Sequence, residues 1–206
     1  MLCLKQPTDG SWAAQALSDV NAVLVDHAHC EMKAASNALS LIARYPDNLE
    51  RTRVLADLAS EEIGHLQRVI GVLVSRGVAL GKPAVDVYAA ELRRQARELS
   101  RDGSTNPLVD RLLVAALIEA RSCERFRLLV EATTSGCHGD LRALWKELFV
   151  AEAGHYRTFV DLANRVVGEA ERVGARLEQL AELEAGIVRK LGSSVPLPGA
   201  RASIHG

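Results

Sequence analysis

Two short motifs of the same spacing place a glutamate and a histidine three residues apart. They are Glu62-Ile63-Gly64-His65 and Glu152-Ala153-Gly154-His155. Residues i and i+3 are neighbours on the surface of an α-helix, so each motif can offer two ligands to one metal ion. One such motif arises often by chance, but two copies with similar flanking residues indicate a common role in metal binding.

Both motifs interrupt apolar stripes of helical periodicity. The stripe around the first motif contains Leu55, Leu58, Val69 and Val72, and the stripe around the second contains Leu141, Trp145, Leu148, Phe159, Leu162 and Val166. Steps of three and four residues keep each stripe on the core-facing side of its helix. A buried carboxylate without a partner is costly, and a bound cation removes that cost. We also expect the glycine inside each motif to mark close approach by a neighbouring helix.

Two further glutamates occupy the middle of apolar helix faces. Glu31 precedes Glu62 by 31 residues, and Glu119 precedes Glu152 by 33. Glu124 is the alternative to Glu119 as the ligand from this helix, but it precedes Glu152 by only 28 residues. His27 lies one turn before Glu31 and is either a supporting residue of the site or a core histidine.

The resulting set of four carboxylates and two imidazoles predicts a two-metal centre. Its members are Glu31, Glu62, His65, Glu119, Glu152 and His155. Four carboxylates and two neutral imidazoles carry four negative charges, which two divalent cations neutralise. Oxygen-rich ligation with two imidazoles suits iron, or less well manganese, better than copper or structural zinc. A single residue of this kind is more often satisfied by a neighbouring side chain, but six at matched positions favour a metal site.

The elements that must position these residues are helices. Aromatic residues make up only 4% of the chain, and no strand pattern is evident. Four long helices are expected over about residues 12–44, 49–76, 108–133 and 141–167, with shorter helices over about 85–100 and 169–191. We therefore predict an all-α four-helix bundle with an extra helix in the crossover and a C-terminal helix. Residues 1–192 are expected to form one domain, and residues 193–206 a loosely ordered tail.

Several classes of protein are disfavoured by composition. No two of Cys3, Cys30, Cys123 and Cys137 form a Cys-x-x-Cys pair, so rubredoxin-type sites are not supported and reduced thiols are expected. We see no signal peptide and no apolar run of roughly 20 residues, so a cytoplasmic protein without a membrane span is expected. The net charge of −1 means that nucleic-acid binding would need a local basic patch.

The ligand pattern resembles that of the ferritin-like di-iron carboxylate proteins. Within this group the chain resembles the tRNA 2-methylthio-isopentenyladenosine hydroxylases, the MiaE family. The similarity lies in the segments 26–35, 60–66, 118–126 and 151–156. It implies a ferritin-like fold and hydroxylation of the isopentenyl group of the modified adenosine next to the tRNA anticodon, with dioxygen as oxidant.

The resemblance also implies roles and partners. Glu62 and Glu152 would bridge two iron ions, Glu31 and Glu119 would be terminal ligands, and each iron would have one histidine. Electrons would come from a separate ferredoxin or flavoprotein reductase. The candidate tRNA contacts are arginines around the crossover helix, for which a solvated helix face is the alternative role. They are Arg93, Arg94, Arg97 and Arg101.

Three other functions remain open from the sequence. One is iron oxidation or peroxide detoxification of the ferritin and rubrerythrin kind. A second is a manganese catalase. A third is a purely structural bundle without metal, of which a tRNA-binding module is one form.

Overall fold

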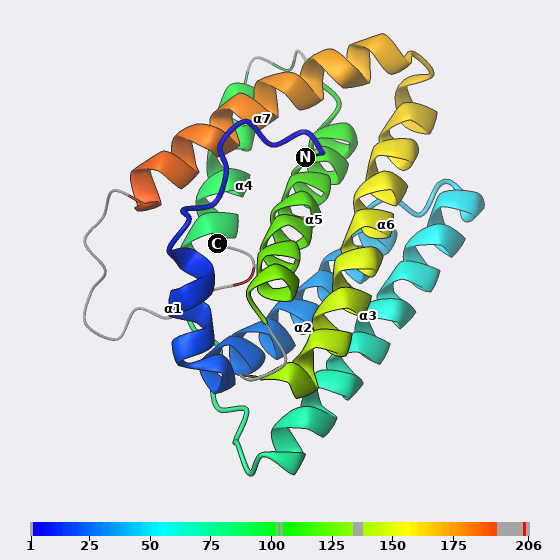
Figure 1. The fold of residues 1–206 in the computed structure, drawn as a ribbon. Helices are drawn as coiled ribbons and strands as arrows, with labels where there is room; N and C mark the ends of the chain where they lie inside the picture. Colours follow the sequence, from blue (N-terminus) through cyan, green and yellow to red (C-terminus); the bar gives the residue numbers. More distant parts are fainter. Residues whose placement is uncertain (1, 102, 104, 134–137, 193–203, 205–206) are drawn as a thin grey trace.

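Helices account for all regular secondary structure in the part of the chain that the structure describes. This computed structural model describes residues 2–101, 103, 105–133, 138–192 and 204 (Figure 1). The elements are α1 (Trp12–Ser18), α2 (Val20–Arg44), α3 (Leu49–Ser75), α4 (Val87–Leu99), α5 (Pro107–Ala132), the 3₁₀ helix η1 (Gly139–Leu141), α6 (Arg142–Val167) and α7 (Ala170–Gly192). The predicted all-α class is confirmed, including the crossover helix α4 and the C-terminal helix α7.

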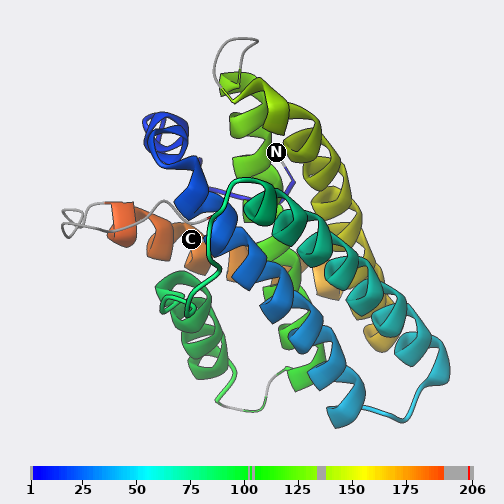
Figure 2. The ribbon, with the colours of Figure 1, turned by 90° about the horizontal axis from the view of Figure 1, so that it is seen from below.

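The four long helices pack as two pairs. Helix α2 packs along α3, and α5 packs along α6. The short connection after α2 contains Pro46, which disfavours helix at the preceding residue, and the Asn48 side chain then accepts the Arg51 N–H to begin α3. The crossover from α3 to α5 carries α4, which packs against α5 and α7 (Figure 2).

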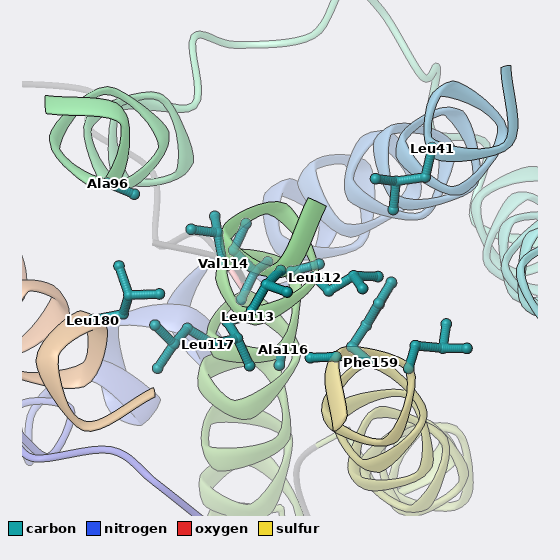
Figure 3. Close-up of a cluster of buried hydrophobic side chains, with 14 of the residues drawn as sticks. Leu41, Ala96, Leu112, Leu113, Val114, Ala116, Leu117, Phe159 and Leu180 are labelled. Carbon is teal, nitrogen blue, oxygen red and sulfur yellow. The ribbon is translucent and has the colours of Figure 1, made fainter. Parts of the chain in front are cut away.

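Helix α5 forms the centre of the molecule, and its middle turns are buried on every side. The seven consecutive residues 112–118 are all buried. Figure 3 shows labelled side chains of α5 directed towards Ala96 of α4, Phe159 of α6 and Leu180 of α7. Each fully buried leucine contributes roughly 1.5–3 kcal/mol, so this helix anchors the elements around it.

The first predicted helix, over residues 12–44, is wrong in one respect. Asp19 has φ −139° and ψ 68°, which divides the segment into α1 and α2. Its carboxylate accepts the Ala22 N–H and caps α2, so local capping outweighs the continuous apolar pattern. Other helix ends differ from the prediction by only a few residues.

The expectation about the two motif glycines is also wrong. A Cβ placed on Gly64 or Gly154 would meet nothing within 4 Å. Both glycines are only partly buried, on helices α3 and α6, which contact each other sparsely. No neighbouring backbone therefore demands glycine at either position.

The predicted tail, residues 193–206, lies outside the described residues except for Ile204. That side chain is fully buried and belongs to an apolar cluster that includes Trp12, Val25 and Phe126. Its N–H donates to Asp26 Oδ2 at 3.2 Å. Of the cysteines, Cys3, Cys30 and Cys123 are free thiols, whereas Cys137 is outside the described part.

Candidate metal centre

Six ionisable side chains from the four long helices meet in the core. Helix α2 provides Glu31, α3 provides Glu62 and His65, α5 provides Glu119, and α6 provides Glu152 and His155. Each is at most 7% exposed. The spacing of three residues on α3 and α6 directs both members of each motif inward, as the apolar stripes around them require.

One group of potential ligands contains Glu31, Glu62 and His65. One ligand atom from each lies within 4.8 Å of the others. His65 Nδ1 is 3.4 Å from Glu62 Oε2 and 3.6 Å from Glu31 Oε2. Two carboxylates and one imidazole at this spacing can coordinate a single divalent cation.

A second group contains Glu62 again, with Glu119 and His155. Their ligand atoms also lie within 4.8 Å of one another. His155 Nδ1 is 3.0 Å from Glu62 Oε1, whereas His65 approaches the other oxygen of the same carboxylate. Glu62 therefore belongs to both groups, with one carboxylate oxygen near each histidine. A carboxylate that bridges two metal ions requires this position. The two imidazole rings have their centroids 5.8 Å apart.

Glu152 belongs to neither three-residue group but lies beside them. It is 1% exposed, and burial together with the carboxylate of Glu119 raises its pKa well above the usual range. Glu152 Oε2 and Glu119 Oε2 accept no hydrogen bond from any described residue. Buried carboxylate oxygens normally have partners, so these two atoms fit a site built for cations.

Burial and neighbouring charges also shift the pKa values of Glu62, His65 and His155, in opposite directions. Burial raises the pKa of Glu62 to about 7, although His155 and His65 oppose the shift. Burial lowers the pKa of His65 and of His155, but the surrounding carboxylates outweigh it and raise both values to about 9. Without cations, these residues share protons to limit repulsion among the carboxylates.

Metal binding is therefore expected to release protons. At pH 7 these pKa values leave His65 and His155 protonated and Glu62 about half protonated, the raised pKa of Glu152 also favours its protonated form, and coordination needs the deprotonated forms. Loading two divalent cations should release roughly three protons per chain, and affinity should rise as pH increases towards 9. Isothermal titration calorimetry in buffers of different ionisation enthalpy measures this number, and a value near zero would contradict the assignment.

Two residues outside the six contact the group directly. His27, which is fully buried, has Nε2 2.8 Å from Glu31 Oε1 and packs edge-on against Phe126. Burial favours the protonated form of Glu31, but His27 and His65 outweigh it and hold the Glu31 pKa well below its usual value. Of the two roles that the sequence left open for His27, this contact with Glu31 favours a supporting residue of the site over a core histidine.

Glu61 was not anticipated from the sequence. Its Oε2 lies 3.0 Å from His155 Nε2, while its side chain remains 64% exposed. Because His155 Nδ1 faces Glu62, the contact with Glu61 orients the imidazole from its far side. The Glu61-Glu62 pair was visible in the sequence, but nothing in α3 alone indicated that Glu61 reaches a histidine on α6.

Replacing Glu61 with alanine should weaken metal binding without disturbing the fold. Loss of an outer partner of a ligating histidine typically costs 10–100-fold in affinity, and the exposure of Glu61 favours about tenfold. Competitive titration with a chelator gives the affinity. Glu50→Ala is the matched control, since Glu50 is an exposed glutamate of α3 paired with Arg165. Equal affinity in both variants would remove Glu61 from the site.

Glu124, the alternative to Glu119, makes other contacts. It accepts hydrogen bonds from Thr8 N and Oγ1 and forms an ion pair with Arg121. Glu119 instead lies with Glu62 and His155. The structure thus brings Glu119, and not Glu124, to the cluster.

The four candidate arginines do not share one environment. Arg93 and Arg97 line a groove beside α2 and α5. Arg94 points elsewhere and pairs with Glu91 and Glu98. Arg101 is exposed and does not line that groove. Among the residues described, no helix is both long and apolar enough to cross a membrane.

Four helices with a central cluster of four glutamates and two histidines define a ferritin-like carboxylate bundle. A solved structure with the same fold is "Protein 43 with aldehyde deformylating oxygenase activity" from Synechococcus. It has a TM-score of 0.86 and 33% identity, and the match covers 100% of this chain and 96% of that one. The ferritin-like fold predicted from the ligand pattern is confirmed.

Sequence comparison narrows this class to one family. Residues 1–197 match the family described as tRNA-(MS[2]IO[6]A)-hydroxylase (MiaE). Two relatives are named tRNA 2-(methylsulfanyl)-N(6)-isopentenyladenosine(37) hydroxylase. The one from Pseudomonas putida is 40% identical over 86% of this chain and 83% of its own length. The one from Salmonella typhimurium is 28% identical over 88% and 82%, respectively. The chain belongs to the MiaE family, as the sequence motifs predicted.

Proposed function

We propose that this protein hydroxylates the isopentenyl group of 2-methylthio-isopentenyladenosine next to the anticodon of tRNA. The observation that carries this proposal is the buried cluster centred on Glu62, in a chain that belongs to the MiaE family. The named activity of the two relatives supplies the substrate and the reaction. Because tRNA is the proposed substrate, we place the enzyme in the cytoplasm.

We further propose two iron ions as the cofactor. Glu62 and Glu152 would bridge them, Glu31 and Glu119 would be terminal ligands, and His65 and His155 would each bind one ion. The unpartnered oxygens of Glu119 and Glu152 support this assignment, as does the oxygen-rich donor set. When bound, two Fe(II) ions supply two electrons for activation of dioxygen.

The residues of the chain would prepare this site in three ways. His27 and Glu61 hold Glu31 and His155 in place. Leu58 and Leu148, one turn before the two motifs and buried, exclude water from the cluster. The histidines and Glu152 exchange protons for metal as the site is loaded.

The reaction needs an external electron donor. Hydroxylation inserts one oxygen atom of dioxygen into a C–H bond and reduces the other to water, which consumes two electrons and two protons. We propose a separate ferredoxin or flavoprotein reductase as their source. Iron storage, peroxide removal and a metal-free tRNA-binding bundle, which the sequence left open, gain no support from the family match.

Mass spectrometry of tRNA nucleosides tests the proposal. Cells without the gene should accumulate the isopentenyl nucleoside and lack the form that is heavier by one oxygen atom. The wild-type gene should restore the heavier form. Persistence of the hydroxylated nucleoside in cells without the gene would refute the assignment.

A further inference from the structure

A groove runs between α2, α4 and α5 and leads to the metal cluster. Its outer part encloses about 460 Å³. A narrow inner part of about 20 Å³ extends to Cys30 and Glu119. Asn37, Arg93, Ala115 and Ile118 line both parts, so the two are continuous. Glu119 is one of the six proposed ligands, and the groove therefore connects the surface with the centre.

Four arginines surround the outer part of this groove. Arg44 comes from the end of α2, Arg93 and Arg97 from α4, and Arg111 from α5. The ion pairs found among the described residues include none of these four. Asp110, the one carboxylate in this lining, is bound by Arg176, with Nε 2.8 Å from Oδ1. The outer part of the groove thus carries an excess of positive charge.

These cations also act on one another. Burial lowers the pKa of the Arg93 guanidinium, the charge of Asp86 opposes this shift, and the nearby charges of Arg111 and Arg97 lower the pKa further. Like charges held together with few carboxylates to balance them oppose folding, which is typical of a site that receives an anion. Arginine is well suited to phosphate because its planar fork can donate two parallel hydrogen bonds.

In two other grooves of the described structure, the arginines are paired with carboxylates. In the groove beside Tyr45, Arg51 pairs with Asp47 and Arg165 pairs with Glu50. In the groove between α5 and α7, Arg172 pairs with Glu169 and Arg176 with Asp110. Of the grooves described, only that between α2, α4 and α5 combines unpaired arginines with a path to a proposed ligand.

We propose that this groove receives the anticodon strand of the tRNA, with its arginines on the phosphates and the modified base directed along Asn37 and Ala115 towards Glu119. This inference rests on the proposed function, because it takes the substrate from there. Chemistry on a base requires that the base leave its stack, and phosphate contacts around the entrance would hold the flanking nucleotides in place.

The narrow inner part adds a role for Arg93. A space of about 20 Å³ holds no more than a water molecule, so the isopentenyl group must displace side chains to enter. Arg93 lines both parts. Movement of its guanidinium outward onto a phosphate would widen the inner passage, so that phosphate binding prepares the path for the base.

Charge reversal on α4 tests the phosphate contacts. Affinity for a fluorescently labelled anticodon stem-loop is measured by anisotropy for the iron-loaded wild type, Arg93→Glu/Arg97→Glu and Arg94→Glu. The double variant should bind about tenfold more weakly or worse and show a shallower salt dependence. Arg94→Glu, on the same helix but outside the groove, should bind within about twofold of wild type. Circular dichroism and iron content confirm that all three proteins are folded.

Two results would overturn the inference. One is wild-type affinity in the double variant, and the other is an equal loss in Arg94→Glu, which would reveal only a response to net charge. Failure of the proposed function is separate: it appears as absence of hydroxylated nucleoside with the wild-type protein, whatever the stem-loop affinities.

A second variant tests the inner path without altering charge. Asn37→Phe places a ring where the two parts of the groove meet. It should lower the hydroxylation rate about tenfold while stem-loop affinity and iron content stay at wild-type values. An unchanged rate would show that the base does not pass this point.

Discussion

Replacing Glu62 with alanine is expected to leave the protein unable to hold either metal ion. Glu62 is the residue common to both ligand groups, and its two oxygens face His65 and His155 separately. Its loss removes a ligand from each ion and leaves two histidines without the carboxylate between them. Iron content after anaerobic loading should fall from about two per chain to near zero, and hydroxylation by more than about 100-fold.

Glu124→Gln is the control for this prediction. Glu124 is also a buried glutamate, but it contacts Arg121 and Thr8 and not the cluster. We expect this variant to retain iron while losing some stability. Normal iron content in Glu62→Ala, or loss of iron in Glu124→Gln, would contradict the ligand assignment.

The largest effect on stability is expected at Glu184. This residue of α7 is fully buried and receives three hydrogen bonds from Arg121 of α5, at 2.8–3.0 Å, and one from Tyr88 of α4. Replacing Glu184 with alanine would leave the buried guanidinium of Arg121 with too little negative charge around it. Breaking such a pair costs about 3–5 kcal/mol, which corresponds to roughly 6–20 °C in melting temperature for a chain of this size.

Denaturant unfolding and calorimetry measure this loss. Glu178→Ala is the matched control, because Glu178 is an exposed glutamate of the same helix paired with Lys5. It should change the free energy of unfolding by less than about 1 kcal/mol. A Glu184→Ala variant within about 1 kcal/mol of wild type would show that Arg121 is compensated by other groups.

The sequence predicted the helices and the six clustered residues for one physical reason. Charged residues on an apolar stripe are rare, so Glu62, His65, Glu152 and His155 stood out against the leucines and valines around them. The same periodicity that marked these residues also located α3 and α6. Glu31 and Glu119 could be chosen because each lies centrally on an apolar face.

Other features depended on contacts between distant segments. Glu61 reaches His155 across 94 residues, and Arg121 reaches Glu184 across 63. The separation of Arg93 and Arg97 from Arg94 depends on how α4 packs against the bundle, which periodicity within α4 does not reveal. The break at Asp19 was missed because one capping interaction outweighed a continuous apolar pattern.

Anomalous diffraction from crystals loaded with Fe(II) is the most direct test of the two-metal centre. Data collected at the iron absorption edge should show two peaks in the core, one in contact with Glu31, Glu62 and His65 and the other with Glu62, Glu119 and His155. Glu152 should contact both. A single peak, or peaks away from Glu62, would contradict the proposed centre.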